Sequence, residues 1–121
     1  KSMAYHITHS EHYILYEPEA EYLQTEDIDE LINEVLSDFA EVTHVIIFMG
    51  HLEYLLEEDL DQLKFLNEEL KAKGGYLLLA SGSENLKKQF DDLVQFTTDI
   101  DDAVEIIESE WLDRELFTEG L

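Results

Sequence analysis

The chain has no cysteine, a single proline, only seven basic residues and no long hydrophobic run. Without cysteine it has neither a disulfide framework nor a thiolate ligand, which excludes disulfide-rich secreted mini-proteins and zinc ribbons. No apolar run approaches the roughly 20 residues of a membrane-spanning helix, and the N-terminus lacks the basic and apolar segments of a signal peptide. We therefore expect a cytoplasmic protein without membrane insertion.

Acidic residues, in contrast, are abundant. Thirty Asp and Glu residues against seven Lys and Arg residues give a net charge of −23. Such a field repels phosphate backbones and anionic lipid, so nucleic acid and membrane surfaces are poor partners. Two explanations of the acidity stay open: adaptation to high salt and solubility, or electrostatic steering toward a basic protein surface.

The size and composition of the chain indicate one folded unit. Its 121 residues suit a single domain, and 45% hydrophobic residues are too many for a disordered chain. We expect one domain over residues 4–121 and interpret residues 1–3 as a remnant that includes residues added ahead of a native Met3.

The first part of the chain predicts a β-hairpin. Segments 4–9 and 12–17 are rich in aromatic and β-branched residues and are separated by the turn-compatible residues 10–11. Pro18 cannot donate to a strand ladder and should end the second strand. Residues 19–24 are then expected to lead irregularly into a helix.

Four later segments show the i, i+3, i+4, i+7 apolar spacing of amphipathic helices. Asp27 with Glu30 predicts a capping box for the first helix, Ser83 and Asp99 predict N-caps for the third and fourth, and residues 74–75 close the second. The residues expected on the inner faces are Ile28, Leu31, Ile32, Val35, Leu36 and Phe39, then Leu56, Leu60, Leu63 and Leu70, then Leu86, Phe90 and Leu93, and finally Ile100, Ala103, Val104, Ile107 and Trp111.

Three apolar runs between these helices predict buried strands, at residues 45–48, 76–80 and 94–97. The element order is then ββαβαβαβα. Alternating strands and helices indicate an α/β fold with a mixed, mainly parallel sheet of about five strands and about four helices. Residues 109–121 either extend the last helix or dock on a partner.

The sequence shows no motif that carries catalysis. Residues 74–75 precede a strand and Gly82 stands alone, so no glycine-rich phosphate loop is present, and no strained G-x-S-x-G turn supports a catalytic serine. His9 and His12 flank the predicted hairpin turn, but this pattern is more typical of a polar turn than of a metal site. We expect no enzyme, no cofactor and no metal.

Residues 44–80 resemble the centre of a STAS domain of the bacterial anti-sigma-factor antagonists. They combine an apolar strand, a short acidic loop, a leucine-striped helix, a Lys-Gly-Gly turn and a second apolar strand, and the whole element order agrees. In that family the loop before the second helix typically reads Asp-Ser-Ser-Gly, and a kinase that is also the anti-sigma factor phosphorylates one of the serines. The resemblance implies a non-catalytic regulatory domain that binds such a partner as a monomer or weak dimer.

Aligning residues 52–60 on that loop places Leu56 at the Asp, Glu57 and Glu58 at the serines, and Asp59 at the glycine, so the usual phosphoacceptor is missing. Acidic residues also favour a helix start whatever its function, so a fixed regulatory charge and a simple helix start both stay open. The docking surface implied by the resemblance comprises Leu56, Glu57, Glu58, Asp59, Ser81, Gly82 and Ser83. Alternative functions are an acidic nucleic-acid mimic that binds a basic protein, and a small-ligand carrier.

Overall fold

The computed structural model describes residues 5–18, 25–38, 44–50, 52–90 and 93–119. Expectations about residues 1–4, residues 19–24 and Phe39 lie outside these ranges. The elements follow in the predicted order ββαβαβαβα. They are β1 (Tyr5–His9), β2 (Ile14–Pro18), α1 (Thr25–Asp38), β3 (His44–Phe48), α2 (Glu57–Ala72), β4 (Tyr76–Ala80), α3 (Glu84–Phe90), β5 (Gln95–Thr97) and α4 (Ile100–Glu119).

The strands form one five-stranded sheet whose spatial order, β1-β2-β3-β4-β5, is the order in the chain. β1 runs antiparallel to β2, and the remaining neighbours are parallel. In the central pair Ile47 lies opposite Leu79, and Val45 opposite Leu77. The structure thus confirms the mixed, mainly parallel sheet that the alternating pattern predicts.

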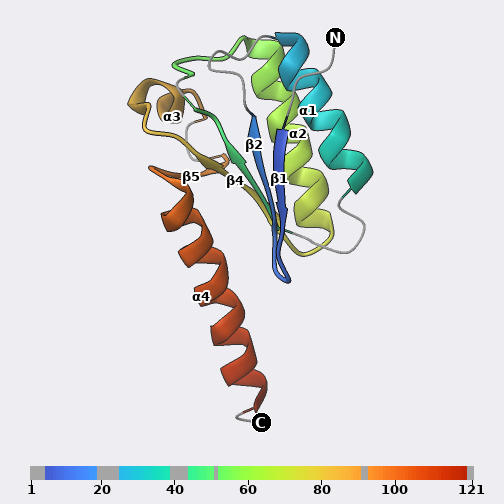
Figure 1. The fold of residues 1–121 in the computed structure, drawn as a ribbon, viewed down its shortest axis with the longest axis vertical. Helices are drawn as coiled ribbons and strands as arrows, with labels where there is room; N and C mark the ends of the chain where they lie inside the picture. The colour runs from blue at the N-terminus through green and yellow to red at the C-terminus, as the bar shows by residue number, and fades with distance from the viewer. Residues whose placement is uncertain (1–4, 19–24, 39–43, 51, 91–92, 120–121) are drawn as a thin grey trace.

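Helices cover the two faces of this sheet unequally. Because successive strand residues point to opposite faces, Val45 and Ile47 join the large core with α1, α2 and α3, whereas Ile46 joins a smaller core with α4. Figure 1 shows α1 and α2 packed together on one side of the sheet and α4 on the other. The chain is a layered α/β fold with the sheet in the middle.

Three helix ends follow the predicted chemistry. The Ser83 hydroxyl accepts a hydrogen bond from the Leu86 amide (3.2 Å), and the Asp99 carboxylate accepts one from the Asp102 amide (2.9 Å), so both residues act as N-caps. α2 ends at a glycine with positive φ, Gly74 (φ 92°). The predicted capping box is wrong, because α1 begins at Thr25 and Asp27 lies inside its first turn.

Three leucines assigned to inner helix faces are exposed instead. Leu36 is 36% exposed, Leu56 47% and Leu93 57%. Leu56 precedes the first residue of α2, and Leu93 follows the last residue of α3, so the helical spacing does not apply to either residue. Leu36 lies at the margin of the stripe, beside the fully buried Val35.

The last helix, α4, has 20 residues. α4 extends to Glu119, so the option that residues 109–121 prolong the helix is confirmed as far as Glu119, and docking of this segment stays a prediction. In Figure 1 its C-terminal part runs beyond the body of the fold. Within the part of the chain that the structure describes, no helix combines the length and apolar character required to cross a membrane.

Candidate docking surface

The first component of the surface is the start of α2. Leu56 has an extended backbone (φ −68°, ψ 153°) and makes no side-chain cap, but its carbonyl accepts hydrogen bonds from the amides of Asp59 and Leu60, both at 3.0 Å. The first turn is acidic, with Glu57, Glu58 and Asp59. Carboxylates at this end are stabilised by the partial positive charge of the helix N-terminus.

Gln89 fixes the segment that leads into α2. Its Oε1 accepts a hydrogen bond from the Leu55 amide (2.8 Å), and its Nε2 donates one to the Leu55 carbonyl (2.9 Å). Leu55 itself is only 5% exposed and belongs to the large core. The loop before α2 is therefore held both by its buried side chain and by a side chain of α3.

This anchored segment presents apolar and acidic groups side by side in the sequence. Tyr54 is 66% exposed and Leu56 is 47% exposed. Glu53, Glu57 and Glu58 next to them are also exposed. Large exposed apolar side chains bordered by polar ones are typical of protein-binding surfaces. We call Glu53, Tyr54, Leu56, Glu57 and Glu58 the α2 docking patch.

The loop after β4 is ordered by its own hydroxyl groups. The Ser81 amide donates to the Thr97 carbonyl (3.0 Å), and the Ser81 hydroxyl accepts a hydrogen bond from the Ser83 amide (3.1 Å). The Ser83 hydroxyl in turn caps α3. Both hydroxyls therefore have structural roles in this loop.

Parallel pairing of β3 and β4 brings the two loops to the same end of the strands. They follow the carboxyl ends of the neighbouring strands β3 and β4, and the Met49 amide donates to the Ala80 carbonyl (2.9 Å) just beyond the paired region. α3 starts directly after Ser83 and carries Gln89, so it connects the second loop to the first.

The residues predicted for the docking surface divide into three groups by accessibility. Leu56, Glu57, Glu58 and Gly82 are exposed, and Ser83 is half-buried. Asp59 and Ser81 are 2% and 5% exposed, so their side chains lie inside the fold and not on its surface. Sequence reasoning missed Tyr54 and Gln89, because no periodic pattern relates a residue of α3 to a loop 34 positions earlier.

Comparison with known proteins identifies the fold. No family model and no curated protein matches the sequence. RsbS from Moorella thermoacetica, in a variant with a serine replaced by glutamate, superposes with a TM-score of 0.72 and 13% identity over 91% of this chain and 97% of that chain. The crystal structure of TM1081, a putative anti-sigma factor antagonist from Thermotoga maritima, superposes with a TM-score of 0.70 and 18% identity. The match covers 88% of this chain and 94% of that chain. The NMR structure of TM1081 superposes with a TM-score of 0.68 and 16% identity, over 84% of this chain and 86% of that chain.

The fold is STAS-like. The resemblance inferred from residues 44–80 is thereby confirmed for the fold. In this STAS-like fold the α2 docking patch lies after the carboxyl end of the central strand β3. The absence of the serine from the family's loop position stays a prediction, since it depends on the alignment of residues 52–60.

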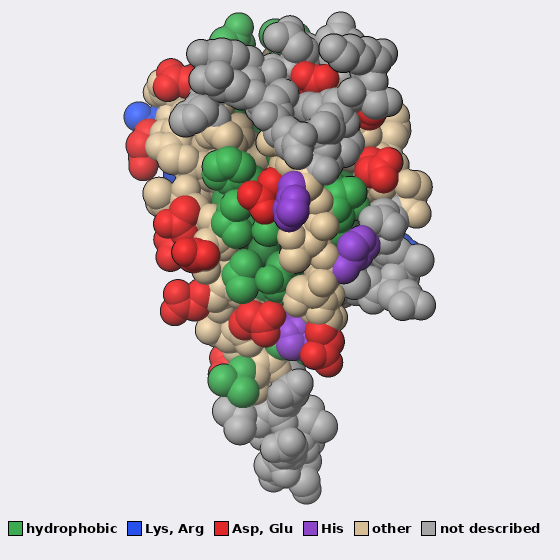
Figure 2. Space-filling model, viewed as in Figure 1, with side chains coloured by type: hydrophobic (Ala, Val, Ile, Leu, Met, Phe, Trp, Pro, Cys, Tyr) green, Lys and Arg blue, Asp and Glu red, His purple; other side chains and the backbone are tan. Residues whose placement is uncertain are grey.

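On the face that Figure 2 shows, most of the charged side chains are acidic. Asp and Glu side chains are spread around a central group of hydrophobic ones, and Lys or Arg appears only at the margin. Among the described residues, no group of three or more His, Asp or Glu side chains is arranged to hold a metal ion. Acidic side chains thus surround exposed hydrophobic side chains on this face.

Proposed function

We propose that this chain is a non-catalytic regulatory domain that binds a protein partner, in the manner of an anti-sigma-factor antagonist, through the α2 docking patch. The observation that carries the proposal is the anchoring of Leu55 by Gln89, which fixes the exposed Tyr54 and Leu56 among carboxylates. Rigid apolar anchors inside a charged rim are the usual composition of a binding surface.

The charge of the patch specifies the chemistry of the partner. With a net charge of −23 and exposed Glu53, Glu57 and Glu58 around the apolar anchors, the complementary surface is basic with an apolar centre. Such charge complementarity increases the association rate and suppresses wrong partners more than it increases affinity. A regulatory protein of the anti-sigma type fits the names of the neighbouring structures.

We further propose that phosphorylation does not switch this surface at the start of α2. Residues 56–59 contain no hydroxyl group, and in our alignment Glu57 and Glu58 occupy the serine positions of the family's loop. The RsbS variant among the neighbouring structures also has a glutamate in place of a serine. Carboxylates here carry the sign of a phosphate with less charge and fewer acceptor oxygens.

The serines nearby are engaged elsewhere, which supports the same proposal. Ser81 is 5% exposed, and the Ser83 hydroxyl caps α3. The Thr97 hydroxyl donates to the Asp99 carbonyl at 2.8 Å. Phosphorylation of Ser81 requires local opening of its loop, and phosphorylation of Ser83 or Thr97 removes a hydrogen bond that orders the start of α3 or the connection to α4.

The test is affinity purification from the native host with two charge-reversed variants. Glu57→Lys with Glu58→Lys alters the patch, and Glu68→Lys with Glu69→Lys makes the same charge change at exposed positions near the other end of α2. We expect the wild type and the Glu68/Glu69 variant to recover one basic regulatory protein that the Glu57/Glu58 variant does not recover. Equal recovery by both variants overturns the docking proposal.

Mass spectrometry of the purified chain tests the proposal that phosphorylation does not switch the surface at the start of α2. Unmodified residues 52–60 in the partner-bound and free forms agree with a site of fixed charge. A phosphate on Ser81, Ser83 or Thr97 whose occupancy changes with partner binding contradicts it, and assigns the switch to the loop after β4 or to the end of β5.

A further inference from the structure

The strand β5 forms one edge of the sheet and has a hollow on each side. Within the described residues it pairs with β4 alone. A strand at the edge of a sheet offers unpaired backbone N–H and C=O groups to other chains. One of the two hollows lies between β5 and α3, and the other lies between β5 and α4, on the opposite face of the sheet.

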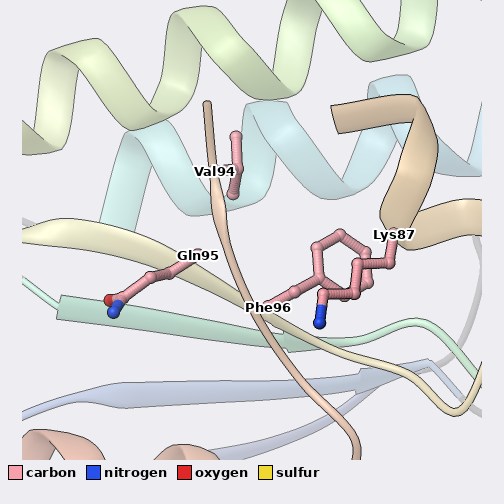
Figure 3. Close-up of a pocket in the computed structure, with 4 residues that line it drawn as sticks. All are labelled: Lys87, Val94, Gln95 and Phe96. Atoms are coloured by element: carbon pink, nitrogen blue, oxygen red, sulfur yellow. The ribbon is translucent and has the colours of Figure 1, made fainter. Parts of the chain in front are cut away.

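The hollow on the α3 side carries a positive charge. It has a volume of about 230 Å³ and is lined by Lys87, Val94, Gln95 and Phe96. Figure 3 shows the Lys87 and Phe96 side chains in this hollow, with Val94 and Gln95 along the strand. Lys87 is exposed, and among the described residues no Asp or Glu forms an ion pair with it. This hollow can therefore accept an acidic side chain.

The hollow on the α4 side carries negative charges. It has a volume of about 560 Å³ and lies between β5 and one stripe of α4, formed by Asp102, Glu105, Ile106 and Ser109. Asp102 and Glu105 are exposed, and Ile106 is half-buried. A lysine or arginine side chain fits this composition, because its methylene groups can pack on Ile106 while its charge meets the carboxylates.

The backbone of β5 presents Phe96 to the open edge. The Thr97 carbonyl accepts a hydrogen bond from the Ser81 amide (3.0 Å), so the backbone groups of Thr97 face the loop that follows β4. Successive residues of a strand direct their backbone groups to opposite sides. The amide and carbonyl of Phe96 therefore point away from β4, between the two hollows.

We propose that β5 pairs with an extended segment of a partner protein in which a basic, an acidic and a basic residue follow one another. The residue opposite Phe96 has its side chain on the same face as Phe96, where its carboxylate meets Lys87. Its two neighbours point to the other face, toward Asp102 and Glu105. Backbone hydrogen bonds attach the segment, and the two hollows select its side chains. The proposal goes beyond the partner-binding function and involves a surface other than the α2 docking patch.

Charge identifies the occupant as another protein and not a second copy of this chain. None of the acidic residues of this sequence has a basic residue on both sides. A net charge of −23 also opposes self-association, whereas a segment with two basic residues and one acidic residue is attracted. Because β5 has only three residues, it offers few backbone hydrogen bonds, so the side chains determine which segment binds.

The first test measures the binding of labelled peptides to the full chain by fluorescence anisotropy. The probe is Ser-Val-Lys-Glu-Lys-Val-Ser, and the control peptide Ser-Val-Lys-Lys-Glu-Val-Ser has the same composition and net charge without the alternation. We expect the probe to bind roughly fivefold more tightly than the control peptide, the effect of about 1 kcal/mol for misplaced exposed charges. Hydrogen exchange of the Phe96 amide should be slower in the presence of the probe.

Matched variants assign the two hollows. Lys87→Glu should weaken binding of the probe roughly fivefold, whereas Lys88→Glu makes the same charge change at an exposed neighbour and should have little effect. Glu105→Lys should likewise weaken binding more than Asp113→Lys, its control on α4. The peptide Ser-Val-Lys-Lys-Lys-Val-Ser should bind more tightly to Lys87→Glu than to Lys88→Glu, because it reverses the charge that meets position 87.

Circular dichroism verifies that each variant is folded. Absence of probe binding, equal binding of the probe and the control peptide, equal effects within either pair of variants, or a Phe96 amide whose exchange does not respond to the probe overturns the proposal. Glu57→Lys with Glu58→Lys should retain the probe, and loss of binding in that variant assigns the peptide to the α2 docking patch instead. Failure at the β5 edge therefore leaves the proposed function untouched, and the reverse also holds.

Discussion

The imidazole ring of His12 stacks on the indole ring of Trp111, with the ring centroids 4.7 Å apart and the planes inclined by 10°. His12 Nδ1 also hydrogen-bonds Glu108 Oε2 at 3.0 Å. The turn of the hairpin is thereby joined to α4, a helix 96 positions further along the chain. The predicted polar turn thus has a structural role, because His12 helps to hold α4 on this face of the sheet.

Removing this ring should loosen α4. We expect His12→Ala to lower the free energy of unfolding by about 1–2 kcal/mol, the sum of an aromatic pair and a hydrogen bond. Trp111 is the only tryptophan, so its fluorescence reports the loss directly. His6→Ala, at an exposed position of β1, is the control and should change neither quantity. Unaltered fluorescence and stability in His12→Ala contradict the role assigned to the stack.

A buried amide joins α2 to the sheet. Asn67 is 2% exposed, accepts a hydrogen bond from the Leu77 amide (2.9 Å) and donates one to the Leu93 carbonyl (3.1 Å). Asn67→Ala leaves the buried Leu77 amide without its acceptor, so we expect a loss of about 2–4 kcal/mol in chemical denaturation. Asn85→Ala removes an exposed amide from α3 and should cost less than about 0.5 kcal/mol.

If Asn67→Ala and Asn85→Ala unfold at the same denaturant concentration, the bridge contributes nothing to stability. Asn67→Asp adds a discriminating case, because it keeps an acceptor for the Leu77 amide but loses the donor to Leu93. A buried unpaired charge makes it at least as destabilising as the alanine variant. Thermal unfolding of the three variants ranks them directly.

The sequence predicts the element order because each strand and helix has its own local periodicity. Apolar runs such as 45–48 and 76–80 form the central strands, and Ser83, Asp99 and Gly74 mark helix ends through short-range chemistry. These signals act within four or five residues, so they can be recognised without knowledge of the tertiary structure.

The candidate site could be predicted only in part from the sequence, because tertiary contacts determine which of its residues are exposed. Leu56 continues the leucine spacing of α2 and therefore reads as core, yet it precedes the helix and is exposed. Asp59 reads as part of an acidic surface and is buried. The contact between Gln89 and Leu55 has no counterpart in any local pattern, so only the folded chain reveals what holds the patch.

The Gln89 contact predicts a local effect rather than a global one. Gln89→Ala removes both hydrogen bonds to Leu55, so the Leu55 amide should exchange with solvent about tenfold faster or more, while the free energy of unfolding falls by only about 1–2 kcal/mol. Lys88→Ala, at the exposed neighbouring position of α3, leaves exchange at Leu55 unchanged. Equal exchange in the two variants means that the core side chain alone fixes the loop.

The last prediction concerns the end of α2, where the Gly74 amide donates to the Lys71 carbonyl and the Gly75 amide to the Leu70 carbonyl, both at 3.0 Å. This Schellman arrangement requires the positive φ of Gly74, 92°, although open space surrounds its Cα. Gly74→Ala should therefore cost about 1–2 kcal/mol through backbone strain alone. Gly82→Ala meets equally open space without a positive φ and should stay within about 0.5 kcal/mol of the wild type. Because the two substitutions add the same methyl group to solvent-accessible loops, a difference in their denaturation midpoints measures the conformational requirement at Gly74, and equal midpoints show that the helix ends without it.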